Sequence, residues 1–437
     1  MKKFAFIGAG SLQFTTTCFK DLLTYDAFQD CEIRLMGRTR ERLDYMEKIC
    51  NKIKDAMNCP DCKIITTTDR AEALKGANGV VCTITHASID VWRHDIEIPK
   101  KYGVDINIGD TRSVSGIFRA LRNIPVLLDI CKDIETYCPN AVFINYTNPV
   151  AMLCNAMQKY TNVKVTGLCH SVQGTAAMLA EWLEIPAEEV NYVCKGVNHQ
   201  AFYTRLEHNG EDLYPRLREY LESEENYNKE QVRNEMFLKL GYYMTESSGH
   251  NSEYNQWFRK RPDLIEKYCT HSTNWNPGEY ALSLKLRLKR QENWREPYEE
   301  FLAKDVDTAK SHEYAANIFN ACLGDGKPFV FNGNVLNHGS IPNLPYDCCV
   351  EVPVVADRNG FQTIIAGDLP EQLAIMINTT ARIESLVVEA AMKKSKELVY
   401  QAVYMDPLTS AVCSLEEMKQ MCDELFEVNQ EFLGDYT

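Results

Sequence analysis

The first residues of the chain constrain its fold most. The apolar run Phe4–Ile7 leads directly into Gly8 and Gly10, and the helical spacing of Phe14–Leu23 follows. A strand that turns on glycine into a helix predicts a dinucleotide-binding unit, in which the first glycine makes the tight turn and the second lets a pyrophosphate approach the backbone. Gln13 stands where the third glycine of the fingerprint is expected. A purely structural strand–turn–helix is therefore the alternative.

Strand and helix patterns alternate through the first third of the chain. This alternation predicts an α/β fold with a Rossmann-like, doubly wound parallel sheet. Beyond residue 195 the pattern changes, because helical spacing dominates residues 211–300, short β-like runs fill Phe329–Val355, and Gln372–Lys396 is helical again. We predict a dinucleotide-binding domain at 1–195 and an α+β substrate- and metal-binding domain at 196–437, packed on the first. The expected early elements are strands at Glu32–Met36, Ile64–Thr66, Gly79–Ile84, Ala141–Asn145 and Val163–Leu168, and a helix at Arg40–Met57.

Composition narrows the class of protein. The 437 residues are 45% hydrophobic, enough for a large core, and the net charge of −14 argues against a nucleic-acid partner. We find no apolar run long enough to span a bilayer and no secretory leader, so we expect no membrane partner and a cytoplasmic location. The 17 cysteines are then free thiols, and the Cys59–Cys62 pair is expected in a surface loop.

Two short motifs suggest a metal site. Cys169 follows a predicted strand in CHSV, and His199 ends a GVNH segment. Taken singly, each residue is more often structural, as a small buried thiol or a hydrogen-bonded core histidine. Behind a nucleotide motif, a thiolate and an imidazole together predict a site for a divalent transition metal.

The expected cofactor crevice has further candidate residues. Gly37 stands where an acid for the ribose hydroxyls is expected, and Arg38 follows it, which favours NADP over NAD. Alternatively, Arg38 is solvated and NAD binds without the acid. In the NYTNP segment, Asn148 can present its amide to sugar hydroxyls, although plain turn chemistry also explains the motif. The candidate cofactor contacts are Gly8, Gly10, Ser11, Arg38, Thr83 and Asn145; the candidate substrate contacts are Asn148, Asp110 and Arg119.

The motifs together resemble glycoside hydrolase family 4. They are GAGS at the start, TNP at 147–149, CHSV, GVNH, YYMTESSGHNSEY at 242–254 and NHGSIPNLPYDCCVEVPV at 337–354. Within that family, Cys-His-Ser-Val resembles the α-galactosidase (melibiase) branch. The resemblance implies an NAD(P)- and divalent-metal-dependent glycosidase, with Mn²⁺ the usual metal, rather than the ordinary two-carboxylate mechanism.

The resemblance also implies a reaction course and residue roles. Transient oxidation of the sugar at C3 acidifies the C2 proton, a base removes it, the aglycone leaves, water adds, and C3 is reduced again, so that the cofactor is recycled. Cys169 and His199 match the metal ligands, Asn148 the sugar contact and His170 the acid. The base is left open among Tyr242, Tyr243, Glu246 and His250, although Glu246 and His250 can instead orient each other or the metal shell. The family also implies a homodimer or homotetramer.

Alternatives to an α-galactosidase differ in substrate or in class. The same mechanism could act on α-glucosides or α-galacturonides. A 2-hydroxyacid dehydrogenase of the lactate or malate type would share the cofactor domain but has no need of a Cys ligand, and a nucleotide-sensing protein would need no metal. Trp257, Trp275 and Trp294 could stack on sugars or simply pack in the core.

Overall fold

A computed structural model describes residues 1–271 and 276–437, and in these residues the strands form one continuous sheet. Its order is β3-β2-β1-β4-β5-β6-β10-β11-β7-β8-β9, with β12 paired to β11. The first six strands are all parallel and have the doubly wound order of a Rossmann fold, as predicted. They are β1 (Lys3–Ile7), β2 (Glu32–Met36), β3 (Lys63–Thr67), β4 (Gly79–Cys82), β5 (Val142–Asn145) and β6 (Lys164–Gly167).

The strands of the second half extend this sheet. β10 pairs antiparallel with β6 through Asn334 and Gly167, so the mixed sheet joins the two halves of the chain. The domain boundary predicted at residue 195 lies inside β7. The added strands are β7 (Val190–Val197), β8 (Gln200–His208), β9 (Glu211–Asp212), β10 (Phe329–Leu336), β11 (Cys349–Asp357) and β12 (Gly360–Thr363).

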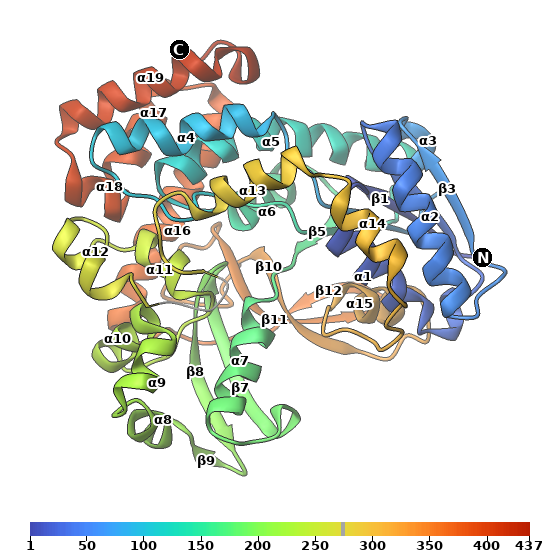
Figure 1. Cartoon of the computed structure of the whole chain (residues 1–437), viewed down its shortest axis with the longest axis horizontal. Coiled ribbons are helices and arrows are strands. Elements are labelled where there is room, and N and C mark those ends of the chain that lie inside the picture. Colours follow the sequence, from blue (N-terminus) through green and yellow to red (C-terminus); the bar gives the residue numbers. More distant parts are fainter. Residues whose placement is uncertain (272–275) are drawn as a thin grey trace.

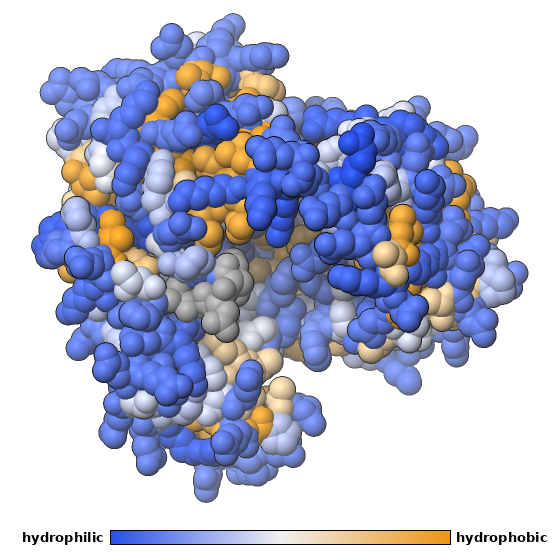
Figure 2. All heavy atoms as spheres, viewed as in Figure 1, coloured by the Kyte–Doolittle hydropathy of each residue, from blue (hydrophilic) through white to orange (hydrophobic). Residues whose placement is uncertain are grey.

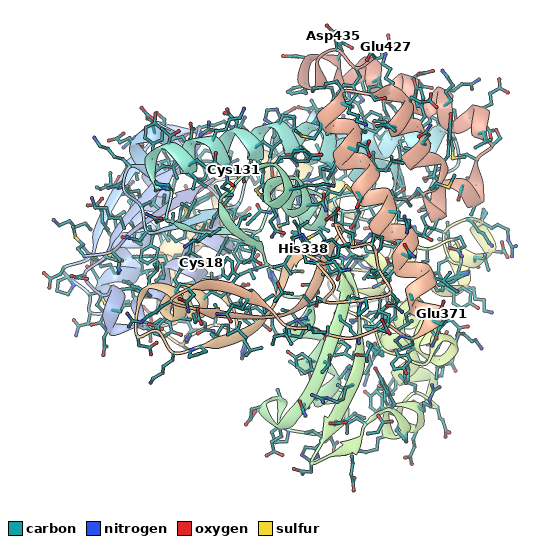
Figure 3. The ribbon with its side chains drawn as sticks, turned by 180° about the vertical axis from the view of Figure 1, so that it is seen from behind. Cys18, Cys131, His338, Glu371, Glu427 and Asp435 are labelled. Atoms are coloured by element: carbon teal, nitrogen blue, oxygen red, sulfur yellow. The ribbon has the colours of Figure 1, made fainter. Side chains whose placement is uncertain are left out.

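Helices cover both faces of the parallel sheet because its strands are apolar on both sides. Along β1, Phe4 and Phe6 pack in one buried cluster and Ala5 and Ile7 in another, as the two-residue repeat of a strand requires. Cys18 and Cys131, labelled in Figure 3, belong to these two clusters. The helices of the first half are α1 (Leu12–Leu23), α2 (Arg40–Ala56), α3 (Arg70–Leu74), α4 (Ile89–Lys101), α5 (Ser113–Tyr137), α6 (Val150–Tyr160) and α7 (Ser171–Trp182), with short 3₁₀ turns at Asp26–Phe28 and Ala187–Glu189. Of these, α7 packs against β7 rather than on the parallel sheet.

Most of the remaining helices form a lobe beside β8 or a layer over α4–α6, and two of them, α14 and α15, pack against α2 and α1 (Figure 1). α16 is the longest of them, and Figure 3 shows it running along the rear face from Glu371. They are α8 (Tyr214–Tyr220), α9 (Glu224–Lys229), α10 (Gln231–Leu240), α11 (Ser248–Tyr254), α12 (Pro262–Tyr268), α13 (Leu282–Glu292), α14 (Glu296–Ala303), α15 (Ala315–Leu323), α16 (Glu371–Lys393), α17 (Lys396–Tyr404), α18 (Pro407–Val412) and α19 (Leu415–Leu433).

The Cys59–Cys62 segment differs from its prediction. Both thiols are buried rather than on a surface loop, and Cys62 Sγ lies 3.8 Å from Cys31 Sγ. The Pro and Asp between the two cysteines suggested exposure, but the turn leads into β3 and packs its apolar atoms against α2. Every cysteine of the described chain is a free thiol.

Hydrophilic side chains cover most of the face shown in Figure 2, which is also notched between the lobe carrying β7–β9 and the parallel-sheet half. Among the described residues, no helix has the length and apolar character needed to cross a bilayer.

Candidate active site

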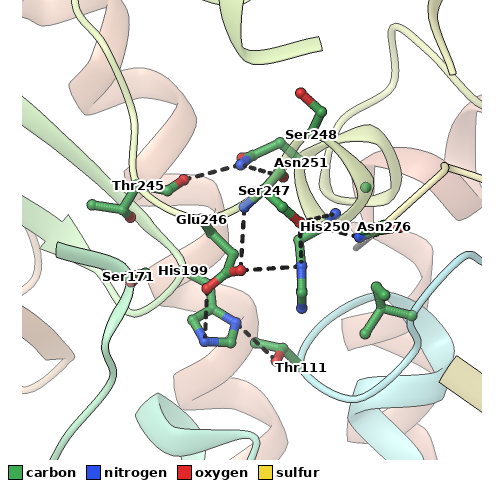
Figure 4. A network of polar contacts seen from close by, with 12 residues as sticks. Thr111, Ser171, His199, Thr245, Glu246, Ser247, Ser248, His250, Asn251 and Asn276 are labelled. Carbon is green, nitrogen blue, oxygen red and sulfur yellow. Dashed lines mark hydrogen bonds and ion pairs between the residues drawn. The ribbon is translucent and has the colours of Figure 1, made fainter. Parts of the chain in front are cut away.

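Three side chains from distant parts of the chain converge in a cluster that can hold a metal ion. Cys169 follows β6, His199 sits in the turn between β7 and β8, and Glu246 precedes α11. One ligand atom of each lies within 4.8 Å of the others. His199 Nε2 is 3.1 Å from Cys169 Sγ. The same nitrogen is 3.5 Å from a Glu246 carboxylate oxygen (Figure 4). A thiol, an imidazole and a carboxylate form a donor set suited to a divalent transition metal.

The backbone is held in an uncommon conformation at two of these positions. His199 has φ of 62° and Glu246 has φ of 67°. Side chains other than glycine rarely adopt this left-handed region, and such residues gather at functional sites where the surrounding structure enforces them. The β7–β8 turn and the segment before α11 thus aim His199 and Glu246 at each other.

Contacts on the far side of the imidazole fix its tautomer. Thr111 Oγ1 lies 3.1 Å from His199 Nδ1, and the same hydroxyl donates to Asp110 at 2.8 Å. Because the carboxylate can only accept, the Thr111 hydroxyl is left to accept from Nδ1–H. The lone pair of Nε2 then faces Cys169 and Glu246, as a metal ligand requires.

Charges around the cluster set the protonation of its members. Burial lowers the pKa of His199 to about 4, which keeps the imidazole neutral. Burial opposes ionisation of Glu246, but His250 and His199 outweigh it and lower its pKa to about 2. Burial raises the pKa of the Cys169 thiol well above its usual value, and Glu246 adds to this. Since a coordinated thiol is deprotonated, a bound cation would reverse the state of Cys169.

The candidate catalytic residues of the 242–254 segment divide into two groups. His250 Nδ1 contacts Glu246 at 3.2 Å and the Ser247 hydroxyl at 2.8 Å, so it belongs to the cluster (Figure 4). Tyr243 instead lies in the core of the β8 lobe, where its hydroxyl donates to Asn234. Tyr242 lines a surface groove with Tyr214. The structure therefore does not bring Tyr242 or Tyr243 to the cluster.

A tyrosine that sequence reasoning did not single out takes their place. The Tyr254 hydroxyl lies 3.3 Å from His199 Nδ1, and the Arg112 guanidinium covers its ring at 4.8 Å. Tyr254 comes one helical turn after His250 in α11, so the i, i+4 spacing was the available signal. Arg112 itself donates to the Asn198 carbonyl and to Glu384, which braces the GVNH turn from behind.

The three candidate substrate residues lie together at the edge of the cluster. Asn148 Nδ2 is 3.4 Å from Asp110, and Arg119 Nε donates to the Asn148 carbonyl at 3.1 Å. The Asn148 side-chain oxygen is buried with no protein partner among the described residues. Burial works against ionisation of Asp110, yet His250 and Arg119 hold its pKa at about 2. An amide oxygen without a partner beside an ionised carboxylate suits a ligand with several hydroxyls.

His170 points to a different neighbourhood. Its side chain is 47% exposed, its Nδ1 lies 3.3 Å from Glu313, and its ring lies 5.5 Å from that of Phe14. It begins α7 beside the first turn of α1. The predicted acid thus lies between the cofactor motif and the metal cluster rather than within the cluster.

The glycine-rich turn has the form of a dinucleotide site. Gly8 has φ of +89°, its carbonyl accepts from Thr83 Oγ1, and a side chain at Gly8 would lie 2.5 Å from the Thr83 carbonyl oxygen. Ser11 begins α1 without a side-chain cap, which leaves the first N–H groups of the helix for a ligand. Arg38 is exposed and donates to the Thr85 carbonyl. The buried Asn145 uses its amide on the Thr147 backbone and so shapes the TNP turn.

The tryptophans lie apart from the cluster contacts. Trp257 is partly exposed beside Phe258, and Trp294 packs against Tyr45 and Tyr298. Trp275 lies outside the described residues.

A dinucleotide turn, a sulfur-containing metal cluster and a polar edge suited to a ligand with several hydroxyls characterise the site, and comparisons with known proteins give the family. Residues 3–185 match the model of family 4 glycosyl hydrolases, and residues 194–409 match that of the family 4 glycosyl hydrolase C-terminal domain. The chain belongs to glycosyl hydrolase family 4 and is a glycoside hydrolase.

Relatives and solved structures resemble the chain over its whole length. An α-galactosidase of Bacillus subtilis is 40% identical over 100% of both chains, and one of Rhizobium meliloti is 37% identical over 100% of this chain and 90% of its own. A putative glucosidase of B. subtilis superposes with a TM-score of 0.85 at 24% identity, covering 97% of this chain and 99% of the other. A 6-phospho-β-glucosidase of Thermotoga maritima, solved with manganese, NAD⁺ and glucose-6-phosphate, gives a TM-score of 0.80 at 22% identity over 98% and 99%.

Proposed function

We propose that the protein is an α-galactosidase that works with a tightly bound dinucleotide, NAD or NADP, and with a divalent metal. Mn²⁺ is the metal that we expect to activate it best. The convergence of Cys169, His199 and Glu246 is the observation that carries the metal-dependent mechanism. The names of the two relatives at 40% and 37% identity support the α-galactoside as substrate. The family match leaves the lactate- or malate-type dehydrogenase without support.

The residues present fit both groups. The donor set of the cluster suits Mn²⁺ or another transition metal, and the uncapped start of α1 after Gly10 suits a pyrophosphate. When bound, the nicotinamide supplies hydride transfer at sugar C3 and the metal supplies Lewis acidity toward the sugar oxygens. Cys169, His199 and Glu246 would hold the metal, and Gly8, Gly10, Ser11 and Thr83 would hold the dinucleotide.

Residues at the edge of the cluster bind and orient the sugar in this proposal. Asn148 accepts a sugar hydroxyl at its partnerless amide oxygen, and Asp110 accepts a second. Arg119 holds the Asn148 backbone in place and contributes the positive charge that keeps Asp110 ionised.

Proton transfer at C2 and at the leaving oxygen completes the proposal. His250 takes the C2 proton, because the Glu246 carboxylate at its Nδ1 would stabilise the imidazolium that forms. His170 gives a proton to the departing oxygen, since it lies between the cofactor turn and the cluster. Replacing His250 by Gln should stop C2 exchange with solvent, whereas Tyr242→Phe should leave it unchanged. Unchanged C2 exchange in the His250→Gln variant would mean that another residue is the base.

Hydrolysis of three aryl glycosides tests the substrate. With Mn²⁺ and dinucleotide present, we expect turnover of the α-galactoside to exceed that of the α-glucoside and the α-galacturonide. Relatives named α-galacturonidase, at 27% identity, make the uronide the main competitor. If the enzyme prefers the α-glucoside or the α-galacturonide, the galactoside assignment is wrong, but the proposed mechanism is unaffected.

We also propose that the chain works in the cytoplasm as a homodimer or homotetramer. Free cysteines throughout the described chain support a reducing compartment. Light scattering of the purified protein tests the assembly, and a monomer at working concentration would contradict it.

A further inference from the structure

Helix α14, from the second half of the chain, is fastened to the glycine-rich turn at its start. The Tyr298 hydroxyl donates to the Gly10 carbonyl at 2.5 Å, and α14 packs against α2 (Figure 1). Tyr298 is buried, so this bond connects two segments 288 residues apart inside the protein. The second half therefore contributes to the wall of the cofactor turn.

Arg42, in the first turns of α2, is held between this helix and the turn. Its guanidinium lies 4.9 Å from the centre of the Trp294 ring, and its positive charge is close to the Tyr298 phenol. Its stem covers the open side of Gly10, since a side-chain carbon built there would lie 3.6 Å from Arg42 Cδ. The Trp294 ring and the packing of the stem at Gly10 thus hold the guanidinium beside the residue where a pyrophosphate is expected to approach.

Neighbouring arginines show how Arg42 differs. Arg40 is paired with Asp44 at 3.0 Å, and Arg295 with Glu41 at 2.7 Å. In the described part of the chain, no carboxylate lies within the 4.0 Å of an ion pair from Arg42. A half-buried, fixed guanidinium with no acidic partner is well suited to a phosphate, because its fork of donors matches the phosphate oxygens.

We propose that Arg42 binds a phosphate of the dinucleotide, and that Trp294, in the turn before α14, and Tyr298 of α14 position it for this role. The inference rests on the proposed use of NAD or NADP. The phosphate is either the pyrophosphate, which both dinucleotides carry, or the 2′-phosphate, which only NADP carries. In either case, residues from both halves of the chain form the cofactor site.

Calorimetric titration of dinucleotide-free protein with NAD and with NADP tests the proposal without any catalytic readout. We expect Arg42→Gln to weaken binding by about tenfold to a hundredfold, the range for one charge-assisted hydrogen-bonding group. If affinity falls for both dinucleotides, Arg42 contacts the pyrophosphate. If affinity falls for NADP alone, Arg42 contacts the 2′-phosphate. Arg40→Gln, on the same helix but already paired with Asp44, should bind both as the parent protein does.

A second variant and the binding of the parent protein make the outcome decisive. Arg42→Met retains the length of the stem against Gly10 and replaces Arg42→Gln if that variant does not fold. If the parent protein binds both dinucleotides and the Arg42 variant binds them just as tightly, the role of Arg42 is refuted and the cofactor assignment stands. A parent protein that binds neither dinucleotide would overturn the cofactor assignment and this inference with it.

Discussion

Thr111 accepts a hydrogen bond from Nδ1 of His199 while giving its own hydrogen to Asp110, and this relay turns the Nε2 lone pair toward Cys169 and Glu246. Thr111→Val keeps the shape of the side chain and removes the acceptor. We expect the variant to bind Mn²⁺ about tenfold to a hundredfold more weakly, the usual cost of losing a partner behind a metal-binding histidine. Metal titration measures the loss. Thr204→Val, which removes a hydroxyl bonded to a β7 carbonyl, is the matched control; equal losses in both variants would refute the relay.

Removal of a proposed metal ligand should have a larger effect. Cys169→Ala or His199→Ala should abolish activation by divalent metal and leave dinucleotide binding intact, because the remaining side chains do not complete the donor set. Activity against metal concentration and dinucleotide titration measure the two effects. Cys322→Ala removes a partly exposed thiol outside the cluster and should behave as the parent does. Full metal-dependent activity in Cys169→Ala would show that the assignment is wrong.

Cofactor choice is expected to depend on Arg38. The side chain is exposed and donates to the Thr85 carbonyl, so it can turn toward a 2′-phosphate near Gly37. We expect NADP to bind at least as tightly as NAD, and Arg38→Ala to weaken NADP by about tenfold or more while sparing NAD. Titration of both dinucleotides decides this. A preference for NAD that survives the substitution would mean that Arg38 merely faces solvent.

Stability at low pH should depend on Asp105, which is paired with the buried Arg259 and with Lys100 just before the 107–111 loop. Burial opposes ionisation of Asp105, but these cations outweigh it and lower its pKa below the unfolded value. Since the folded pKa is the lower one, the stabilisation is present above the unfolded pKa and is lost as pH falls through the folded pKa. Asp105→Asn should therefore reduce the free energy of unfolding by about 3 kcal/mol near neutral pH, and by less in acid below about pH 4.

Urea denaturation at both pH values measures this difference. Asp263→Asn, at an exposed pair with Arg261, is the control and should change stability little at either pH. A loss for Asp105→Asn that stayed constant into acid would contradict the role of its charge.

The sequence allowed the fold of the first half to be predicted because local patterns report it directly. The glycines after Phe4–Ile7 and the apolar strands that followed indicated a doubly wound parallel sheet, and the helix boundaries differ by a few residues at most, as at α1. The joining of β10 to β6 was not predictable. It rests on one long-range pairing, Asn334 with Gly167, which leaves no mark in either local pattern.

The candidate site was predicted where chemistry is tied to residue type. Cys169 and His199 stand out by their ligand chemistry, and the structure places them together. Tyr242 and Tyr243 were attractive for the same reason, yet Tyr243 packs in the core of the β8 lobe and Tyr242 lines a surface groove. The positive φ at Glu246 depends on tertiary contacts, so the i, i+4 spacing from His250 was the one sequence sign that Tyr254, rather than its earlier neighbours, reaches His199.

The central claim is that hydrolysis passes through oxidation at C3 and loss of the C2 proton, in a site built on Cys169, His199 and Glu246. Turnover of an α-galactoside in D₂O, followed by NMR of the released galactose, tests it most directly, because an ordinary glycosidase never breaks the C2–H bond. We predict deuterium at C2 of the product. Galactose released with its original hydrogen at C2 would contradict the account.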